Sequence, residues 1–451
     1  MKWVYGNYKK YAWGKDELRP TSKDGHDPWG GMGVTLVDSL DTLWLMGLKG
    51  EFDESIDWIK SSLDFNTVNP GDGYVSVFET TIRSLGGLLS AYDMSQEPVL
   101  KEKAVDLGDR LFKAFDCSGI GIPCGQIRLN GNPAPKNAGW TGGASLLAEV
   151  GTLQVEFRYL SKITGNPTYK EKSDHVFDVI KPQGDGLYYT FISKDTGERK
   201  QDKITLGAMG DSYYEYLLKC WIQGGMKEDH LREKYDKAME GVHKRLLQKT
   251  AGGTVFIADL NSGRLDYKMD HLVCFMGGLF VLGAYTDPLG IDSARAQRDL
   301  RAGIDITETC YQMYIRQPTG LSPEYARFNM GGTSNDIQVP GDAPHYILRP
   351  ETVESFFILH QLTGDEKYVD MGWKVFQAIE KHCKTEVGYG GIRDVRNTNM
   401  RPDNRMESFF LAETMKYLYL LFDPTSASKV DVLHTHVFNT ESHPMRRFDQ
   451  F

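Results

Sequence analysis

The chain has 451 residues, with 52 basic and 61 acidic side chains and a formal net charge of −9. This balance and the lack of any run rich in Lys and Arg argue against nucleic acids and anionic membranes as partners, because both bind basic surfaces. No run of about 18 or more apolar residues occurs, so the sequence predicts no transmembrane helix.

The N-terminal segment, MKWVYGNYKKYAWGKDELRP at 1–20, contains no apolar stretch of the kind found in signal peptides. Either the protein is cytosolic or a targeting or anchoring segment lies outside this sequence. The six cysteines include no pair or cluster with the spacing of a zinc site. Their number alone does not identify the redox compartment.

Two segments match at an offset of 199 residues and indicate a repeated pair of helices. They read ITGNPTY at 163–169 and LTGDEKY at 362–368, and each joins an apolar stretch to a second stretch with helical spacing. This pattern is typical of an αα-hairpin. Similar breaks recur near residues 49–50, 95–96, 164–165, 224–225, 287–288, 363–364 and 423–424.

The stretches before these breaks are apolar on all sides, as in 88–92, 216–219 and 416–422, which predicts buried inner helices. The stretches after the breaks, such as 169–180 and 368–382, are amphipathic and predict an outer layer. Seven such hairpins favour an all-α fold, a closed (α/α)7 barrel in a single domain over 1–451. The segments 115–140, 183–207 and 328–345 are expected to be loops with some short strands.

An acidic residue recurs near the start of every expected inner helix. If these helices run parallel, the acidic side chains surround one cavity at one end of the barrel. For any one of them, capping of a helix N-terminus is the simpler explanation. Seven recurrences beside strongly apolar segments favour the cavity, and the residues are Asp41, Glu79, Glu149, Asp211, Asp270, Glu351 and Glu407.

Buried carboxylates repel one another and need cations or hydroxyl donors. Arg83 and Arg349 stand close to two of them in sequence and are candidate partners. The carboxylates left without such a partner could be stabilised by the hydroxyl groups of a polyol substrate together with a hard cation such as Ca²⁺, which takes oxygen ligands. Two carboxyl groups across a sugar ring supply a general acid and a general base, and a wide ring favours the larger separation of inverting enzymes.

Several long motifs resemble those of the class I α-mannosidases, glycoside hydrolase family 47. The resemblance covers nearly the whole chain and implies an (α/α)7 barrel. It also implies inverting, Ca²⁺-dependent removal of α-1,2-linked mannose from the ends of high-mannose N-glycans. The motifs include YKKYAWGKDEL at 8–18, FETTIRSLGGLLSAY at 78–92, DSYYEYLLK at 211–219, MDHLVCF at 269–275, GLSPE at 320–324, RPETVES at 349–355, MESFFLAET at 406–414 and FNTESHP at 438–444.

The resemblance also implies roles for individual residues. Glu79 matches the general acid, Glu351 the base that activates water, and Asp211 a third essential carboxylate. Thr440 matches the one direct protein ligand of calcium, through its hydroxyl and its carbonyl. Further positions implied in holding the sugar or calcium-bound waters are Arg83, Glu149, His271, Glu324, Arg349, Glu354, Glu407, Phe409, Glu413 and Glu441.

Cys274 and Cys310 match the disulfide of the family, which implies an oxidising compartment. We therefore expect the lumen of the endoplasmic reticulum or Golgi, or secretion, with the targeting segment outside this sequence. Cys117 and Cys124 are close enough to form a second disulfide, with two free buried thiols as the alternative. The remaining two cysteines are expected to be free.

Met209 departs from part of the family. The endoplasmic-reticulum enzymes that remove one mannose carry an arginine there, whereas Golgi and secreted fungal enzymes carry an apolar residue. An arginine offers a rigid fork of hydrogen-bond donors to one glycan branch, and methionine offers none. The sequence therefore predicts broader trimming, toward five mannoses.

Three other functions compete with the hydrolase. A lectin-like member of the same superfamily, which binds mannose glycans in glycoprotein quality control, would keep the barrel and the carboxylates. Terpene cyclases and zinc cyclases share α/α toroids, but they need an Asp-rich motif or His and Cys ligands that this sequence lacks. A purely structural scaffold gives no reason to gather carboxylates. The expected partners are high-mannose N-glycans on glycoproteins, with the protein itself a monomer.

Overall fold

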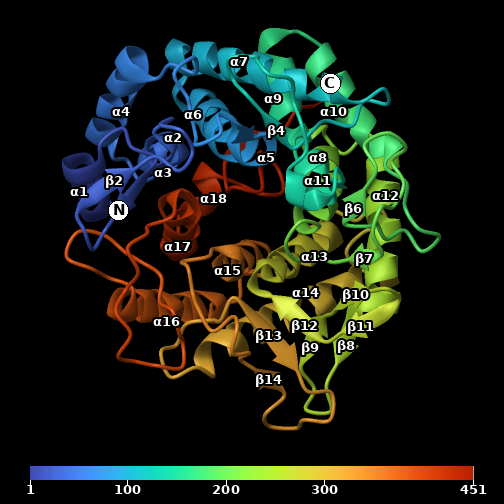
Figure 1. The fold of residues 1–451 in the computed structure, drawn as a ribbon. Coiled ribbons are helices and arrows are strands. Elements are labelled where there is room, and N and C mark those ends of the chain that lie inside the picture. The colour runs from blue at the N-terminus through green and yellow to red at the C-terminus, as the bar shows by residue number, and fades with distance from the viewer. Residues whose placement is uncertain (450–451) are drawn as a thin grey trace.

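The computed structural model describes residues 1–449, which form two concentric rings of helices (Figure 1). The longest segments of the inner ring are α3 (Leu40–Leu45), α6 (Gly86–Ser95), α9 (Gln154–Thr164), α11 (Asp211–Gln223), α13 (Phe275–Tyr285), α15 (Glu351–Thr363) and α17 (Met415–Phe422). The outer ring contains α1 (Lys2–Ala12), α4 (Lys49–Ser62), α7 (Pro98–Phe112), α10 (Thr168–Val179), α12 (Asp229–Gly241), α14 (Ala294–Ile315) and α16 (Lys367–His382).

Six of the inner helices end at the breaks expected from the sequence, whereas α3 ends at Leu45 and the break expected at 49–50 falls inside α4. Gly165 and Gly364 both follow an inner helix with positive φ, which explains the matching TG motifs because glycine adopts this conformation without steric cost. Gln96 adopts the same left-handed conformation after α6. The predicted alternation of inner and outer helices is thus confirmed, and the chain folds as an (α/α)7 barrel.

The closure of the outer ring differs from the expectation of seven consecutive hairpins. The last inner helix, α17, is followed only by the short α18 (Ser426–Lys429), and α1 from the N-terminus takes the vacant outer position. On one side the Tyr5 hydroxyl of α1 lies 2.7 Å from Ser55 Oγ of α4. On the other side Trp3 packs against Tyr389, beyond the end of α16, with ring centroids 5.8 Å apart. The two ends of the barrel are therefore joined through the first helix.

Short antiparallel strands form sheets of two or three strands, and several of these strands lead into inner helices. β3 precedes the segment of Glu79, β5 precedes that of Glu149, and β12 precedes that of His271. The strands are β1 (Glu17–Arg19), β2 (Asp24–His26), β3 (Val75–Ser76), β4 (Gln126–Ile127), β5 (Ser145–Leu146), β6 (Phe191–Ile192), β7 (Lys203–Ile204), β8 (Leu247–Lys249), β9 (Val255–Ile257), β10 (Asp259–Asn261), β11 (Arg264–Asp266), β12 (Lys268–Asp270), β13 (Tyr325–Phe328), β14 (Ile337–Gln338), β15 (His436–Phe438) and β16 (Pro444–Arg446).

Several inner helices begin with short or irregular segments rather than with regular α-helix. Two of these segments are π-helical, η1 (Thr80–Leu85) after α5 (Val77–Glu79) and η6 (Phe410–Thr414) before α17. π-Helical turns are rare and frequently lie at functional sites. The remaining lead-in segments are α2 (Val34–Asp38), α8 (Leu147–Gly151) and η5 (His271–Cys274), and the connections contain the 3₁₀ turns η2 (Lys113–Cys117) and η3 (Gly139–Thr141) and the π-helical turn η4 (Val242–Leu246).

Neighbouring helices approach closely where small residues lie at their contacts. A Cβ atom at Gly277 of α13 would lie 2.2 Å from Thr307 Oγ1 of α14 and 3.0 Å from Ser355 Oγ of α15. Helix α13 is apolar on all sides and buried, as expected for an inner helix. Across residues 1–449, no helix is both long enough and apolar enough to span a bilayer.

The C-terminal segment, drawn in red, passes through the middle of the ring (Figure 1). Its hairpin β15–β16 is held there by a fully buried set of charges. Lys416 Nζ of α17 lies 2.9 Å from Asp41 Oδ1, and the His443 ring lies 2.8 Å from Asp41 Oδ2 and 3.0 Å from Asp38 Oδ1. Asp41 therefore anchors the hairpin rather than facing the cavity, which corrects the expectation from its position in the sequence.

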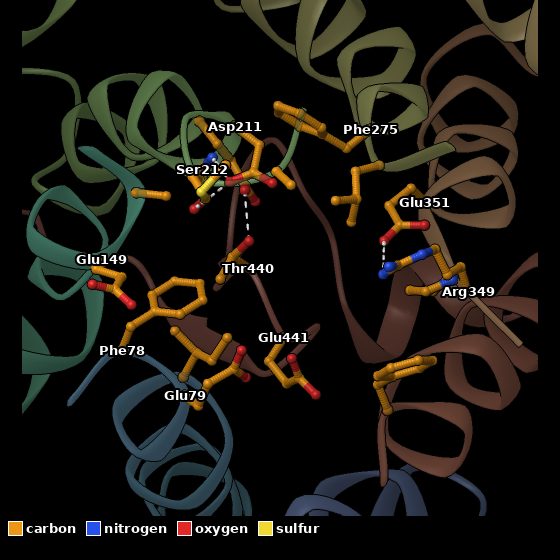
Figure 2. Close-up of a pocket in the computed structure, with 18 of the residues that line it drawn as sticks. Phe78, Glu79, Glu149, Asp211, Ser212, Phe275, Arg349, Glu351, Thr440 and Glu441 are labelled. Carbon is orange, nitrogen blue, oxygen red and sulfur yellow. Dashed lines mark hydrogen bonds and ion pairs between the residues drawn. The ribbon is translucent and has the colours of Figure 1, made fainter. Parts of the chain in front are cut away.

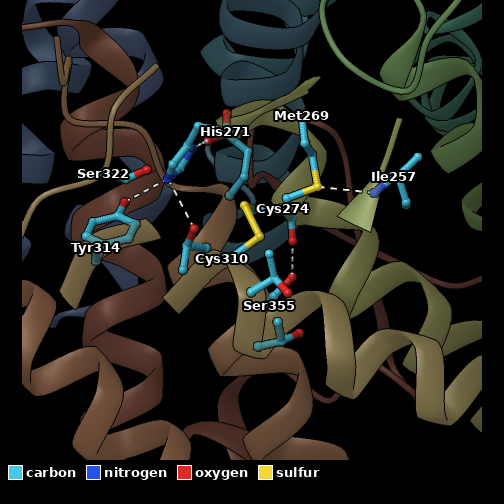
Figure 3. Close-up of a disulfide and its surroundings, with 12 residues drawn as sticks. Ile257, Met269, His271, Cys274, Cys310, Tyr314, Ser322 and Ser355 are labelled. Atoms are coloured by element: carbon cyan, nitrogen blue, oxygen red, sulfur yellow. Dashed lines mark hydrogen bonds and ion pairs between the residues drawn. A yellow bond between two sulfur atoms is a disulfide. The ribbon is translucent and has the colours of Figure 1, made fainter. Parts of the chain in front are cut away.

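The cysteines pair largely as expected. Cys274 and Cys310 form a disulfide between the start of an inner helix and α14, with Cα atoms 5.9 Å apart (Figure 3). Cys117 and Cys124 also form a disulfide, which settles the alternative that the sequence left open. The remaining two cysteines, Cys220 and Cys383, are free and buried, as predicted.

Candidate active site

One cavity of about 380 Å³ opens where the inner helices begin, and its lining is strongly acidic (Figure 2). Its volume falls in the range of roughly 300–1,000 Å³ typical of small-molecule sites. Two arginines, Arg83 and Arg349, are the only cationic side chains in the described lining. Eight carboxyl groups accompany them: Glu79, Glu149, Asp211, Glu215, Glu351, Glu354, Glu413 and Glu441.

Glu79 stands at the junction between α5 and the π-helical turn η1. The Ser76 hydroxyl accepts a hydrogen bond from the Glu79 backbone N–H at 3.2 Å and caps this start. One turn later Arg83 Nε donates to Glu79 Oε2 at 2.8 Å. The same guanidinium contacts Glu441 and donates to Ser408 Oγ at 3.2 Å, so it joins the inner helices to the C-terminal turn.

Asp211 is the first residue of α11 and is enclosed by the cavity wall. Its Oδ1 accepts hydrogen bonds from the Ser212 backbone N–H at 2.7 Å and from Ser212 Oγ at 3.1 Å. Burial, with the nearby charges of Glu215 and Glu351, raises the pKa of Asp211 to about 7 despite these hydrogen bonds. A proton can therefore stay on this carboxyl near neutral pH.

Glu351 is the first residue of α15 and lies across the cavity from Glu79 (Figure 2). Its Oε2 is 2.7 Å from His271 Nδ1, and its Oε1 is 3.9 Å from Arg349 Nη1. Burial alone would raise the pKa of Glu351, but the hydrogen bond with His271 and the charge of Arg349 lower it below its usual range. Asp211 thus favours a proton while Glu351 stays ionised, the division of labour that acid–base catalysis needs.

Thr440 projects from the turn between β15 and β16 into the middle of the cavity (Figure 2). Its hydroxyl donates to Glu215 Oε2 at 2.8 Å. Lys219 Nζ contacts Glu215 and lies 3.9 Å from Glu354 Oε1. Burial and the neighbouring carboxylates raise the pKa of Glu354 to about 8, with Lys219 acting in the opposite direction.

Glu413 and Glu441 line the same cavity, and together with Glu215 and Glu354 they form its acidic floor. Burial and neighbouring carboxylates raise the pKa of Glu413 well above its usual range. The pKa of Glu441 is raised in the same way, by burial and by Asp38 and Glu79, although Arg83 opposes the shift. Without a bound cation these carboxyl groups therefore favour the protonated form, and a cation placed among them would stabilise the ionised form.

Only part of the predicted ring of seven carboxylates forms. Glu79, Glu149, Asp211 and Glu351 line the cavity, whereas the described lining includes none of the other three, Asp41, Asp270 and Glu407. Asp270 pairs with Lys268 at 2.6 Å, and Glu407 pairs with Arg405 at 3.0 Å.

The other expected site residues fall into two groups. Met209, Phe409 and Thr440 line the cavity, together with both arginines, Glu354, Glu413 and Glu441. His271 and Glu324 stand behind the lining and touch it through partners: His271 through Glu351, and Glu324 through a bidentate contact with Arg349, with Arg349 Nε 2.8 Å from Glu324 Oε2.

Sequence reasoning missed Glu215, because it searched only the starts of the inner helices. Glu215 lies one turn after Asp211 on α11, and the i, i+4 spacing places both on the same face of that helix. Lys219 follows one turn further and is buried behind them. An acidic residue and a lysine at this spacing within an apolar helix are the signal that could have located them.

The chain is similar to known proteins over nearly its whole length. A family model described as glycosyl hydrolase family 47 matches residues 1–447. The mannosyl-oligosaccharide 1,2-alpha-mannosidase MNS1 of Arabidopsis thaliana is 44% identical over 449 residues, which cover 98% of this chain and 76% of that protein. The mannosyl-oligosaccharide alpha-1,2-mannosidase IA of Drosophila melanogaster is also 44% identical, over 99% of this chain, which spans only 66% of its length.

Among solved structures, the alpha-1,2-mannosidase from Trichoderma reesei matches with a TM-score of 0.90 and 29% identity, covering 99% of this chain and 97% of that one. A D-mannose isomerase matches with a TM-score of 0.56 at 14% identity, over 79% of this chain and 88% of that one, a likeness of fold alone.

The raised pKa of Glu149 makes the cavity costly to fold at neutral pH. Burial, and then the charge of Glu79, raise this pKa from 4.5 to about 7. The unfolded chain therefore ionises first as pH rises, and stability is lost between about pH 4.5 and 7. Glu149→Gln should raise the free energy of unfolding by on the order of 1–3 kcal/mol above neutral pH and by little at acidic pH.

Thermal unfolding across this pH range, with chelator present, measures the effect. Glu102→Gln on the exposed face of α7 is the matched control and should leave the pH dependence unchanged. A Glu149→Gln variant whose midpoint follows that of the unmodified protein at every pH would contradict the account of a neutral, buried carboxyl.

Proposed function

The chain belongs to glycosyl hydrolase family 47, and we propose that it is an inverting, Ca²⁺-dependent exo-α-1,2-mannosidase that trims high-mannose N-glycans. The observation that supports this proposal most directly is that two carboxyl groups in the cavity have opposite pKa shifts. The pKa of Asp211 is raised to about 7, and the pKa of Glu351 is lowered. The mannosidase names of the relatives support the substrate class.

In this proposal Glu351 is the general base. It accepts a proton from a water molecule as the water oxygen attacks the anomeric carbon of the terminal mannose. The bond from that carbon to the glycosidic oxygen breaks on the opposite face, and the departing oxygen takes up a proton. The position of Glu351 across the cavity from Glu79 supports inversion, because a water must fit between sugar and base (Figure 2).

Glu79 is assigned as the general acid, acting through a water. Its Oε2 pairs with Arg83 Nε at 2.8 Å, and the proton for the departing oxygen would come from a water molecule that Glu79 holds. Asp211 has the role of a protonated partner, which can donate to a sugar hydroxyl or to water near neutral pH.

The acidic floor fits a calcium ion. Thr440 offers its hydroxyl and its carbonyl, and the carboxylates around it provide oxygen atoms that can hold bound waters. Within residues 1–449, no group of three or more His, Cys, Asp or Glu side chains is arranged to hold a metal ion. An ion here would therefore depend on Thr440, on waters and on sugar hydroxyls. When bound, Ca²⁺ supplies positive charge that orients those hydroxyls.

Met209 supports trimming toward five mannoses. It lines the cavity and packs on the apolar group of Ala144, Leu146 and Phe191. Methionine gives this rim no hydrogen-bond donor that would select one glycan branch. The two disulfides support residence in the lumen of the secretory pathway or secretion, because disulfides persist in oxidising compartments. We further propose that the protein acts as a monomer.

The proposal predicts calcium-dependent loss of mannose from a nine-mannose N-glycan. Mass profiling of the glycan should reveal stepwise loss of hexoses in Ca²⁺ and a halt in chelator. Glu351→Gln should bind glycan but trim it at least roughly a hundredfold more slowly, since a general base contributes that much or more. Binding without any loss of hexose in the unmodified protein would instead identify a mannose lectin.

Replacing Met209 by arginine should shorten the trimming sequence. Met209→Arg introduces a fork of donors at the rim, and the product should accumulate after loss of one mannose rather than near five mannoses. Met209 already has a left-handed backbone, with φ of 76°, so Arg and Leu incur the same backbone strain. Met209→Leu is the control that should keep extended trimming, and an unchanged end point in Met209→Arg would refute this role.

A further inference from the structure

A row of hydrogen bonds runs from the candidate base into the wall of the barrel. Glu351 Oε2 lies 2.7 Å from His271 Nδ1, and His271 Nε2 lies 2.8 Å from the Tyr314 hydroxyl (Figure 3). The Thr352 hydroxyl is a second neighbour of Nε2, at 3.1 Å. His271 and Tyr314 are both buried, so water does not compete for these contacts.

We propose that Tyr314 is a positioning residue for the reaction: its hydroxyl donates to His271 Nε2 and thereby holds the proton of the neutral ring on Nδ1, facing Glu351. This inference rests on the proposed function, in which Glu351 is the base. A neutral imidazole has one donor and one acceptor nitrogen, and the partner of one nitrogen sets the tautomer. With Nε2 fixed as acceptor, Nδ1 must donate, and it stabilises the ionised form of Glu351.

The hydroxyl of Tyr314 has the chemistry that this role requires. Burial raises the pKa of Tyr314, so the hydroxyl keeps its proton and remains a donor. Tyr346 and Cys383 lie beyond it, and burial raises the pKa of each, so neither adds charge. Arg349 lies on the other side of Glu351, and the carboxyl groups of Asp211, Glu354 and Glu413 also interact with Glu351 through their charge.

The disulfide between Cys274 and Cys310 helps to keep His271 and Tyr314 next to each other. His271 lies three residues before Cys274, and Tyr314 lies one helical turn after Cys310 on α14. The disulfide between these cysteines joins the two segments, and the rings of His271 and Tyr314 pack edge to face with centroids 5.6 Å apart. Phenylalanine at 314 would keep this packing and would remove only the hydroxyl.

The pH profile of kcat/KM tests the role, because its acid limb reports ionisation of the base. In Tyr314→Phe the ring can move its proton to Nε2, and the limb should shift to higher pH by roughly half a unit to one unit, the equivalent of one hydrogen bond. Adding Thr352→Val removes the second hydroxyl and should shift the limb further.

Tyr311→Phe is the matched control on the same helix, because within residues 1–449 the Tyr311 hydroxyl makes no hydrogen bond. It should leave the limb in place. A loss of packing alone would lower kcat/KM evenly across pH, and a Tyr314→Phe limb that coincides with the control would overturn the proposal.

A second measurement determines the tautomer in the unmodified protein. Ring-nitrogen NMR of the unmodified protein, with isotope-labelled histidine and His271 assigned by its loss in His271→Gln, should find the neutral ring protonated on Nδ1. Protonation on Nε2 would overturn the proposal. Retention of trimming by Glu351→Gln would instead overturn the assignment of the base, and the tautomer would still test Tyr314.

Discussion

Burial of many carboxyl groups around one small cavity is the constraint on which the rest of the structure depends. Each charge removed from water is costly unless a cation, a hydrogen-bond donor or a proton compensates it. Here Arg83, Arg349 and Lys219 compensate a minority of the carboxylates. Burial raises the pKa of Asp211 and of the floor residues Glu354, Glu413 and Glu441, so these carboxyl groups favour a proton until a cation compensates them. Such a cavity is adapted to a ligand rich in hydroxyl groups and to a divalent cation.

The barrel is arranged to hold this charge rigidly. Segments far apart in sequence meet at the cavity because the inner helices all begin at the same end, and the C-terminal turn enters from the opposite side. Beneath that turn, His443 lies between Asp38 and Asp41, and burial of the set is offset by Lys416. Removing one partner would leave a buried charge unpaired, which costs far more than the net contribution of an ion pair.

Much of this arrangement follows from local sequence, and the remainder follows from long-range pairing. Apolar stretches ending in glycine located the inner helices, and acidic residues at helix starts located Glu79 and Glu351. The same reasoning placed Asp41 in the cavity, because the spacing of residues does not reveal its long-range contacts with Lys416 and His443. It overlooked Glu215, which lies inside a helix, and it left the last outer position to a hairpin rather than to α1.

Calorimetric titration of the metal-free protein with Ca²⁺ tests the central claim most directly, because it measures whether the acidic floor around Thr440 binds a cation. The account predicts one ion per chain. It also predicts that Thr440→Val, which keeps the shape of the side chain but removes its hydroxyl, weakens binding by roughly tenfold or more. No binding by the unmodified protein, or equal affinity in the variant, would contradict it.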